Sequence, residues 1–281
     1  MLWIIYSKEV LSDDRPNALN WMLEEAEHLN IECEIMFAED FQMILDKEHT
    51  LLHKNRPIVL PDAAFIRCYH LNLCNFLEQL GVKTYNHSKA LLNSRNKWAT
   101  HLALIKENVN TPKSTLCYVH SNYNHLVEHL GSPFILKDSF GTHGDQVFLI
   151  YSLEDYEKHI KKCSQGIAQT YIESSYGKDL RVHVINHKVV ACVLRQSEHS
   201  FLSNFAQGGQ AKAFVIDEEA KKMAIDATRA LDLNFSGVDL LFDKDGYIVC
   251  EVNGIPGFRT IGLTTKENLP YLMLDYIKEQ L

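Results

Sequence analysis

The sequence has no long apolar run, no pair of neighbouring cysteines and no concentration of positive charge. Its apolar runs are far shorter than the roughly 18 residues of a membrane span, and residues 1–6 lack the basic flank of a signal peptide. The seven cysteines stand singly, which indicates reduced thiols and no zinc site. With a net charge of −8 and dispersed Lys and Arg, nucleic acid is not an expected partner. We expect a cytoplasmic protein that contacts neither membranes nor nucleic acids.

What the chain does contain is the composition of an ordinary globular protein. Its 281 residues are 46% hydrophobic and 23% charged, enough for two or three subdomains. The apolar patterns predict a strand at 2–6, an amphipathic helix at 15–30 and a strand at 32–37. Strand, helix and strand in this order begin a parallel sheet. The first ~90 residues therefore predict a small α/β layer.

Further short elements complete this layer. The patterns predict strands at 57–60, 63–68 and 82–85 and a helix at 71–80, which Gly81 ends. Arg67 lies at the carboxyl end of its strand, where open α/β sheets bind ligands. It is a candidate substrate residue, and a surface ion pair is the alternative interpretation.

Two lysines in the middle of the chain are candidates for anion binding. A helix predicted at 94–107, capped by Asn93 or Ser94, carries Lys97 in its first turn, against the helix dipole. Lys137 ends a strand predicted at 133–137. An exposed surface lysine is the alternative for Lys97.

A polar loop follows Lys137 and precedes a strand predicted at 147–151. Gly141 and Gly144 expose backbone N–H groups that can close over phosphates, although an ordinary hairpin turn fits equally well. The loop is not a P-loop, because G-x-x-x-x-G-K-S/T is absent, and no G-x-G-x-x-G follows a strand.

The stretch at 238–257, VDLLFDKDGYIVCEVNGIPG, predicts a β-hairpin. A three-residue loop at 244–246, with Gly246 at positive φ, places Asp239 opposite Glu251. Asn253, two residues on, shares the face of Glu251. Two facing acids in an apolar context are expensive unless a divalent cation with oxygen ligands compensates them. A solvated edge hairpin is the alternative.

Between these regions the patterns predict strands at 166–173, 179–185 and 188–195, and a helix at 217–231. Asp179 and Arg181 share one strand face, and Arg195 ends the return strand. Ser203 opens a polar loop, S-N-x-x-x-G-G.

The order of these motifs resembles the ATP-grasp superfamily, and within it the RimK-type carboxylate–amine ligases (alpha-L-glutamate ligase-like). The resemblance covers nearly the whole chain and is strongest from Ser94 to Gly257. It implies an α/β (α+β) ATP-grasp fold with an N-terminal parallel α/β subdomain. The implied subdomains are 1–92, 93–168 and 169–281, with ATP clasped between the second and third.

The resemblance also implies roles for individual residues. The implied cofactors are ATP and two Mg²⁺ ions, with Mn²⁺ as an alternative metal. The ATP contacts would be Lys97, Lys137, Gly141, Gly144, Gln169, Thr170, Tyr171, Ile172, Asp179, Ser203 and Asn204. The metal ligands would be Asp239, Glu251 and Asn253, and the catalytic arginines Arg181 and Arg195.

The chain departs from the family pattern in its substrate region. The RimK loop R-S-N-L-H-R-G-G reads LSNFAQGG here, so two arginines are absent; Thr170 replaces a Glu and Gln146 a glycine. Arg259, like Arg67, is a candidate substrate residue that could supply a replacement charge. The implied reaction joins a carboxylate donor to an amine acceptor such as an amino acid, a peptide or a carrier protein. A kinase acting on a hydroxyl and a non-catalytic nucleotide-binding module are the alternatives, and homo-oligomerisation is left open.

Overall fold

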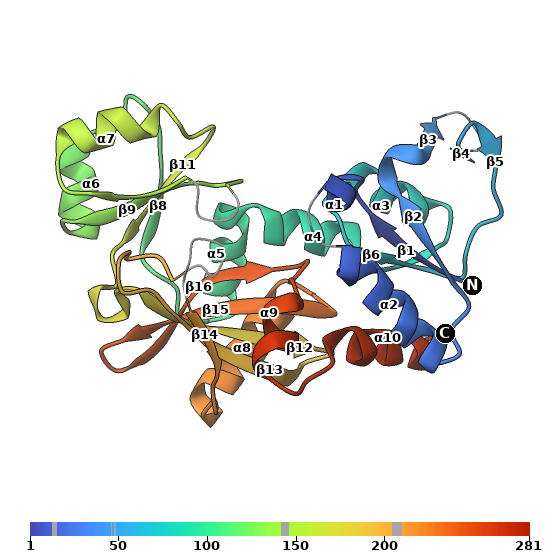
Figure 1. Ribbon diagram of the computed structural model, residues 1–281. Helices are drawn as coiled ribbons and strands as arrows, with labels where there is room; N and C mark the ends of the chain where they lie inside the picture. Colours follow the sequence, from blue (N-terminus) through green and yellow to red (C-terminus); the bar gives the residue numbers. More distant parts are fainter. Residues whose placement is uncertain (13–15, 46, 48, 142–145, 204–209) are drawn as a thin grey trace.

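The computed structural model describes the chain except for residues 13–15, 46, 48, 142–145 and 204–209 (Figure 1). A four-stranded sheet of order β2-β1-β6-β7 organises its N-terminal part, and all its pairings are parallel, as predicted. Its strands are β1 (Leu2–Tyr6), β2 (Cys33–Phe37), β6 (Ala63–Ile66) and β7 (Lys83–Tyr85). Its helices are α1 (Glu9–Ser12), α2 (Pro16–His28), α3 (Leu71–Gln79) and α4 (Ser88–Arg95).

Strand β1 is the centre of this sheet because all five of its residues are apolar and buried. The chain leaves β1 toward β2 on one side and reaches β6 on the other. The carboxyl ends of β1 and β6 are therefore the point where the connections diverge, which is where open α/β sheets bind ligands. Ile5 pairs with Ile66, so Tyr6 and Arg67 lie side by side at this point on neighbouring strands.

A small antiparallel sheet extends from this region (Figure 1). It consists of β3 (Phe41–Ile44), β4 (Thr50–His53) and β5 (Arg56–Pro57), and the 3₁₀ helix η1 (Ala38–Asp40) leads into it. The strand predicted at 57–60 is wrong beyond Pro57, because residues 58–60 pair with no strand.

The middle of the chain forms an antiparallel sheet of order β10-β9-β11-β8. Its strands are β8 (Ser114–Cys117), β9 (Phe134–Asp138), β10 (Val147–Ile150) and β11 (Gly166–Thr170), with helices α6 (Tyr123–Leu130) and α7 (Leu153–Ile160). The predicted boundary between residues 168 and 169 falls inside β11. The helix predicted at 94–107 is two helices, α4 and α5 (Lys97–Lys106). They meet at Asn96, whose side chain accepts hydrogen bonds from Trp98 N and Ala99 N, so the predicted cap at Asn93 or Ser94 is wrong.

The C-terminal part is built on a five-stranded antiparallel sheet of order β14-β13-β12-β15-β16. The strands are β12 (Lys178–Ile185), β13 (Lys188–Gln196), β14 (Gln210–Ala213), β15 (Phe235–Asp243) and β16 (Gly246–Asn253). One face packs on α8 (Glu218–Ala230), and its other elements are η2 (Glu173–Ser175), α9 (Arg259–Thr264) and α10 (Leu269–Glu279). Helix α10 returns to α2, so the chain ends beside its N-terminal part (Figure 1).

The β15–β16 hairpin has the predicted pairing of Asp239 with Glu251 but a different loop length and an added bulge. Its loop has two residues, 244 and 245, because Phe242 pairs with Tyr247 and Asp243 with Gly246. The predicted three-residue loop is therefore wrong, although Gly246 does have positive φ. A bulge between Leu240 and Asp239 adds one residue on β16 and brings Asp239 opposite Glu251. The predicted pair is confirmed.

No helix among the described residues is both long and apolar enough to cross a membrane. The mixed architecture of one parallel and several antiparallel sheets agrees with the predicted α/β (α+β) class.

Candidate active site

Most of the predicted site residues line one cavity between the central and the C-terminal sheets. The space between its walls, including solvent at the mouth, is about 960 Å³. The predicted residues in its wall are Lys97, Lys137, Gly141, Gln169, Thr170, Tyr171, Ile172, Asp179, Arg195, Ser203, Asp239 and Glu251. Arg181, Asn253, Arg67 and Arg259 are not in the wall. Gly144 and Asn204 lie outside the described residues.

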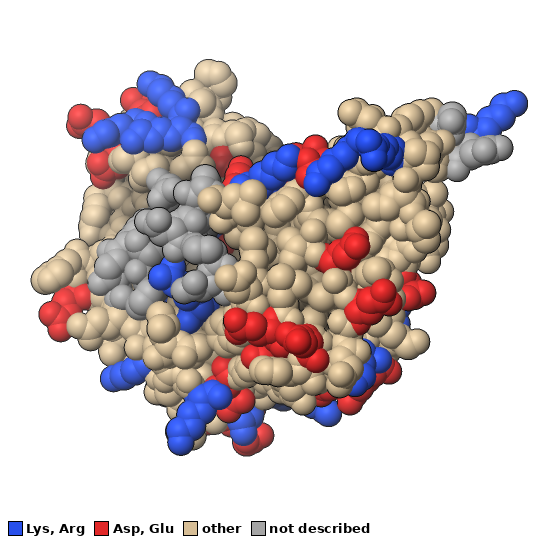
Figure 2. Space-filling view, turned by 45° about the vertical axis from the view of Figure 1, so that its right-hand side comes forward, with Lys and Arg blue, Asp and Glu red and all other residues tan. Residues whose placement is uncertain are grey.

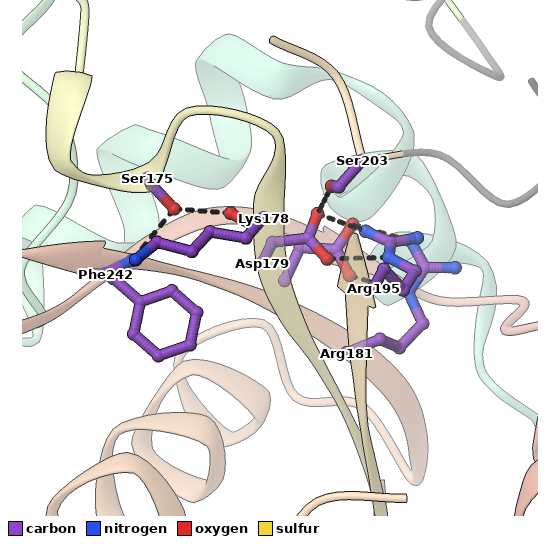
Figure 3. A network of polar contacts seen from close by, with 8 residues as sticks. Ser175, Lys178, Asp179, Arg181, Arg195, Ser203 and Phe242 are labelled. Atoms are coloured by element: carbon purple, nitrogen blue, oxygen red, sulfur yellow. Dashed lines mark hydrogen bonds and ion pairs between the residues drawn. The ribbon is translucent and has the colours of Figure 1, made fainter. Parts of the chain in front are cut away.

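The sequence patterns did not predict the other residues of the wall. Leu241 lies two residues after Asp239, so the strand period alone could have identified it. Cys250 lies at the bulge beside Glu251, which no sequence pattern announces. Ser175 and Lys178 come from the turn before Asp179, and their hydrogen bonds tie this turn to β15 (Figure 3). The remaining missed residues are Pro112, Ile135, Asp138, Gln146, Val147, Phe201 and Leu202.

The two candidate lysines meet at one end of the cavity. Both are buried, with 7% of Lys97 and 4% of Lys137 exposed. Lys97 Nζ donates to Gly141 O at 2.6 Å and lies 3.5 Å from Glu251 Oε1. Burial and the neighbouring Lys137 lower the pKa of Lys97, which Glu251 partly opposes. Within the described chain no carboxylate lies at ion-pair distance from Lys137, so this end of the cavity can accept an anion.

Asp138 fixes the start of the loop that follows Lys137. Its Oδ1 accepts a hydrogen bond from Phe140 N, and its Oδ2 accepts two from Ser164. These bonds lower the pKa of Asp138 although burial raises it. Gly141 is thereby held where its carbonyl meets Lys97.

Gln169 uses its side chain for structure. Its Nε2 lies 2.7 Å from both Ser114 Oγ and His101 Nε2, which links β11 to β8 and α5. Burial holds the pKa of His101 well below its ordinary value, so this imidazole is neutral and accepts the bond from Gln169. The cavity therefore meets the backbone of residues 169–172 rather than the Gln169 amide.

Two arginines and two aspartates form a network beside Glu251, because Asp239 pairs with Glu251 across the hairpin (Figure 3). Arg195 binds Asp179 through Nε and Nη2 at 2.7 and 2.6 Å, and its Nη2 also reaches Asp239 at 2.9 Å. Arg181 binds Asp239 in the same bidentate way, at 2.6 Å for both bonds. The Ser203 hydroxyl donates to Asp179. Both guanidinium groups keep Nη1 outside these bonds.

The charge balance of this network determines the state of Asp239. Burial alone would raise its pKa, but Arg181 and Arg195 outweigh burial and lower the pKa to about 2. Asp239 is therefore ionised at neutral pH. The same network raises the pKa of Arg195 although burial lowers it.

The three predicted metal ligands differ in how many of their oxygen atoms are free to bind an ion. Carboxylate and amide oxygens suit Mg²⁺. Glu251 is 35% exposed toward the cavity and has only Lys97 at ion-pair distance within the described chain. Asp239, in contrast, already accepts three hydrogen bonds from arginines. Asn253 pairs with Gly237 at the end of β16, outside the cavity wall. Among the described residues no three His, Cys, Asp or Glu side chains form a group that could hold a metal ion.

The two candidate substrate arginines lie apart from the cavity. Arg67 Nη2 donates to Pro256 O at 2.9 Å, next to the C-terminal sheet. Arg259 begins α9 and is exposed. On the face in Figure 2, Lys and Arg are interspersed with Asp and Glu and form no broad basic surface.

Two buried histidines predict a marked pH dependence of stability. Burial lowers the pKa of His101 well below 6.5 and that of His183 to about 3. Because only the unfolded chain takes up these protons, stability falls as pH drops below 6.5, by about 1.4 kcal/mol per unit and histidine. We expect His183 alone to lower the unfolding free energy by roughly 2 kcal/mol between pH 7.5 and 5, and His101 to add to this loss, measured by urea unfolding. His101→Gln should flatten the profile and the exposed His125→Gln should not; a flat wild-type profile contradicts the prediction.

Comparison with known proteins finds one family over most of the chain. Residues 94–277 match the RimK-like ATP-grasp domain family. The chain is 32% identical over 213 residues to a probable alpha-L-glutamate ligase of Haemophilus influenzae, covering 73% of this chain and 70% of the relative. A probable alpha-L-glutamate ligase of Pseudoalteromonas translucida is 30% identical over 271 residues, 92% of this chain and 90% of the relative. Among solved structures, the ATP-grasp ligase PsnB complexed with minimal precursor, Mg and ADP superposes with a TM-score of 0.73 at 17% identity, over 99% of this chain and 96% of PsnB.

Proposed function

Because the chain belongs to the RimK-like ATP-grasp family, we propose that it is an ATP-dependent ligase that joins a carboxylate to an amine. The observation that carries the proposal is the pair of buried lysines at one end of a cavity whose wall also holds Glu251 and Asp239. Among the described residues, Lys97 and Lys137 have too few carboxylate partners to balance their charge, so an anion is expected to bind them. A polyphosphate supplies several negative charges at once.

The cavity offers a separate environment for each part of ATP. Ile135, Ile172 and Leu241 provide apolar surface for the base, and the backbone of residues 169–172 provides hydrogen-bonding groups. Lys97 and Lys137 would contact the phosphates, together with backbone groups near Gly141. Asp179 and Ser203 lie in the same wall, and Asp179 would accept a ribose hydroxyl beside its bonds to Arg195.

The proposed reaction has two steps. A carboxylate oxygen attacks the terminal phosphorus of ATP, giving an acyl phosphate and ADP. The amine nitrogen then attacks the acyl carbon, the C–O bond to phosphate breaks, the nitrogen loses a proton, and an amide and phosphate leave. Phosphoryl transfer of this kind depends on positioning and charge stabilisation, which the lysines and Arg195 would provide from the cavity wall, with Arg181 next to them through Asp239.

The cofactors would be ATP and Mg²⁺. Glu251 would hold Mg²⁺, joined by Asp239 and Asn253 where their other contacts leave oxygen lone pairs free. Bound Mg²⁺ neutralises charge on the transferred phosphoryl group. Two ions, and Mn²⁺ in their place, stay predictions.

The substrates would be an amino acid as amine and an amino acid, peptide or protein as carboxylate. The relatives are named as probable alpha-L-glutamate ligases, and another PsnB structure is a complex with the precursor peptide PsnA2 and AMPPNP. The loss of two arginines from residues 202–209 argues that this chain recognises its substrate differently from RimK itself. We therefore expect the N-terminal subdomain, proposed as residues 1–92, to take part in the choice.

An ADP-release screen tests the proposal. The full chain with ATP and Mg²⁺ should release ADP when supplied with the right pair from a panel of amino acids and peptides, L-glutamate included. The product mass should equal the sum of the two substrates minus one water. A product carrying a phosphate on a hydroxyl would show a kinase, and ATP binding without ADP release across the panel would show a binding module.

A further inference from the structure

Three buried polar atoms at the junction of the N-terminal and C-terminal sheets have no hydrogen-bond partner among the described residues. They are Tyr6 Oη, Arg67 Nε and His183 Nδ1. Native structures satisfy the great majority of buried polar groups, so each exception needs an explanation. Tyr6 and Arg67 stand at the carboxyl ends of β1 and β6, the usual ligand position of an open α/β sheet.

The three side chains face one another across this junction. Tyr6 continues the row of Leu2 and Ile4, which packs toward the C-terminal sheet in one common core. On β12, His183 lies between Ile185, in that same core, and Arg181, in the network of the cavity. Its neighbours on the adjacent strands are Ala191 and Gly237, and Pro256, which accepts the hydrogen bond from Arg67, packs over Gly237.

Arg67 lies beside the Tyr6 hydroxyl, whose pKa burial raises and Arg67 partly lowers, but Arg67 lacks a counter-charge. Its Nη2 donates to Pro256 O, and its guanidinium lies 5.3 Å from the ring centroid of Phe65 and 5.4 Å from that of Phe258. No carboxylate in the described part of the chain forms an ion pair with it. Arg67 is half-buried with its Nε fully buried, and charges taken out of water are normally paired.

The surroundings of His183 have a positive excess. Arg181, Arg195 and Arg67 all disfavour its protonated form, and only Asp239 favours it. Arg181 is neutralised by Asp239, and Arg195 by Asp179. The positive charge of Arg67 is therefore the one near His183 that no carboxylate of the described chain balances.

We propose that Arg67, Tyr6 and His183 form a binding site for a carboxylate of the amino-acid substrate that is not itself activated. This inference rests on the proposed ligase function. A guanidinium with two neutral donors suits a planar anion of single charge, whereas the buried lysines of the cavity suit phosphates. The site adjoins Arg181, so its occupant would have its reacting group near the end of the cavity where Asp239 lies. The carboxylate can come from the α-carboxyl group or from the side chain of the amino acid.

The test measures binding as well as turnover in the full-length protein. Wild type, Arg67→Gln, Arg67→Lys and Tyr6→Phe are titrated calorimetrically, with the ATP analogue AMPPNP present. The probes are the common amino acids and, in particular, L-glutamate, L-glutamine and the α-amide of L-glutamate. Arg56→Gln, an exposed arginine on β5, is the matched control.

We expect Arg67→Gln to weaken binding of the amino acid on the order of 10- to 100-fold, with AMPPNP affinity unchanged. Arg67→Lys keeps the charge but loses Nε, so its loss should be intermediate. Arg56→Gln should bind as wild type. If L-glutamine binds and the α-amide does not, the α-carboxylate occupies the site; the reverse result assigns the side-chain carboxylate.

Tyr6→Phe separates a binding role from a structural one. Removing a buried hydroxyl without a partner should leave the free protein at least as heat-stable as wild type, while amino-acid binding weakens about 10-fold. A merely structural Tyr6 would show unchanged binding. The inference is overturned if Arg67→Gln and Tyr6→Phe bind as wild type does, or if wild type binds no probe. If wild type binds the amino acid through Arg67 but never releases ADP, the ligase proposal fails and the site stands.

Discussion

Glu251→Gln abolishes ADP formation, with an expected loss on the order of 10³-fold, while the protein folds as wild type does. The side chain of Glu251 is 35% exposed, and its Oε1 lies 3.5 Å from Lys97 Nζ. Glutamine keeps its shape and removes its charge, so the stability change should stay within about 0.5 kcal/mol. ADP release and thermal unfolding of the purified variant measure the two effects separately.

Asp245→Asn is the matched control for this variant. Asp245 is exposed in the turn of the same hairpin, at the opposite end from Glu251. The Asp245→Asn enzyme should retain full activity at the Mg²⁺ concentration that suffices for wild type. Residual activity of Glu251→Gln should require more Mg²⁺, because an oxygen ligand has lost its charge. Full activity of Glu251→Gln would refute the assignment of the cavity as an active site.

The sequence predicted the elements of this hairpin better than their register. Alternation of apolar residues identified both strands, and the acids on one face identified the site. The turn was predicted one residue too long, and a bulge on β16 corrects the pairing of Asp239 with Glu251. Because the bulge adds one residue on β16, the two differences cancel and Asp239 still pairs with Glu251. The apolar period of a strand does not reveal a bulge.

The same limit applies to the arginine network. Strands β12 and β13 join at a tight turn, and without interruption their register would put Asp179 opposite Leu194. A bulge between His183 and Val184 shifts the pairing, so Asp179 faces Arg195. Sequence placed Asp179 and Arg195 at matching strand ends, but their ion pair depends on this one extra residue.

Helix boundaries show why local pattern is insufficient. The apolar period continues across residues 94–107, yet the chain breaks at Asn96, where the amide side chain replaces helical hydrogen bonds. That break gives α5 its own N-terminus at Lys97 and directs this lysine toward Gly141. The N-terminal sheet needed no such detail, because strand, helix and strand in sequence already specify parallel pairing.

Asp239→Asn is expected to be the most destabilising substitution in the site, lowering the unfolding free energy by about 3–5 kcal/mol. Asp239 is 5% exposed and accepts three hydrogen bonds from Arg181 and Arg195. Asparagine keeps the volume but presents an N–H group to a guanidinium and leaves a buried positive charge uncompensated. Urea unfolding at pH 7 measures the loss.

Two further variants determine whether the charge itself is responsible. Asp243→Asn, exposed at the end of the same strand, should change stability by less than about 0.5 kcal/mol. Arg181→Met combined with Asp239→Asn removes a cation together with its anion, so the double variant should be more stable than the sum of the single losses predicts. A cost below about 1 kcal/mol for Asp239→Asn would mean that solvent reaches and screens the network. The two substitutions differ in their expected effect on stability because the two carboxylates differ in burial. Asp239 is buried and binds two arginines, whereas Glu251 is partly exposed to the cavity, where it can bind a ligand.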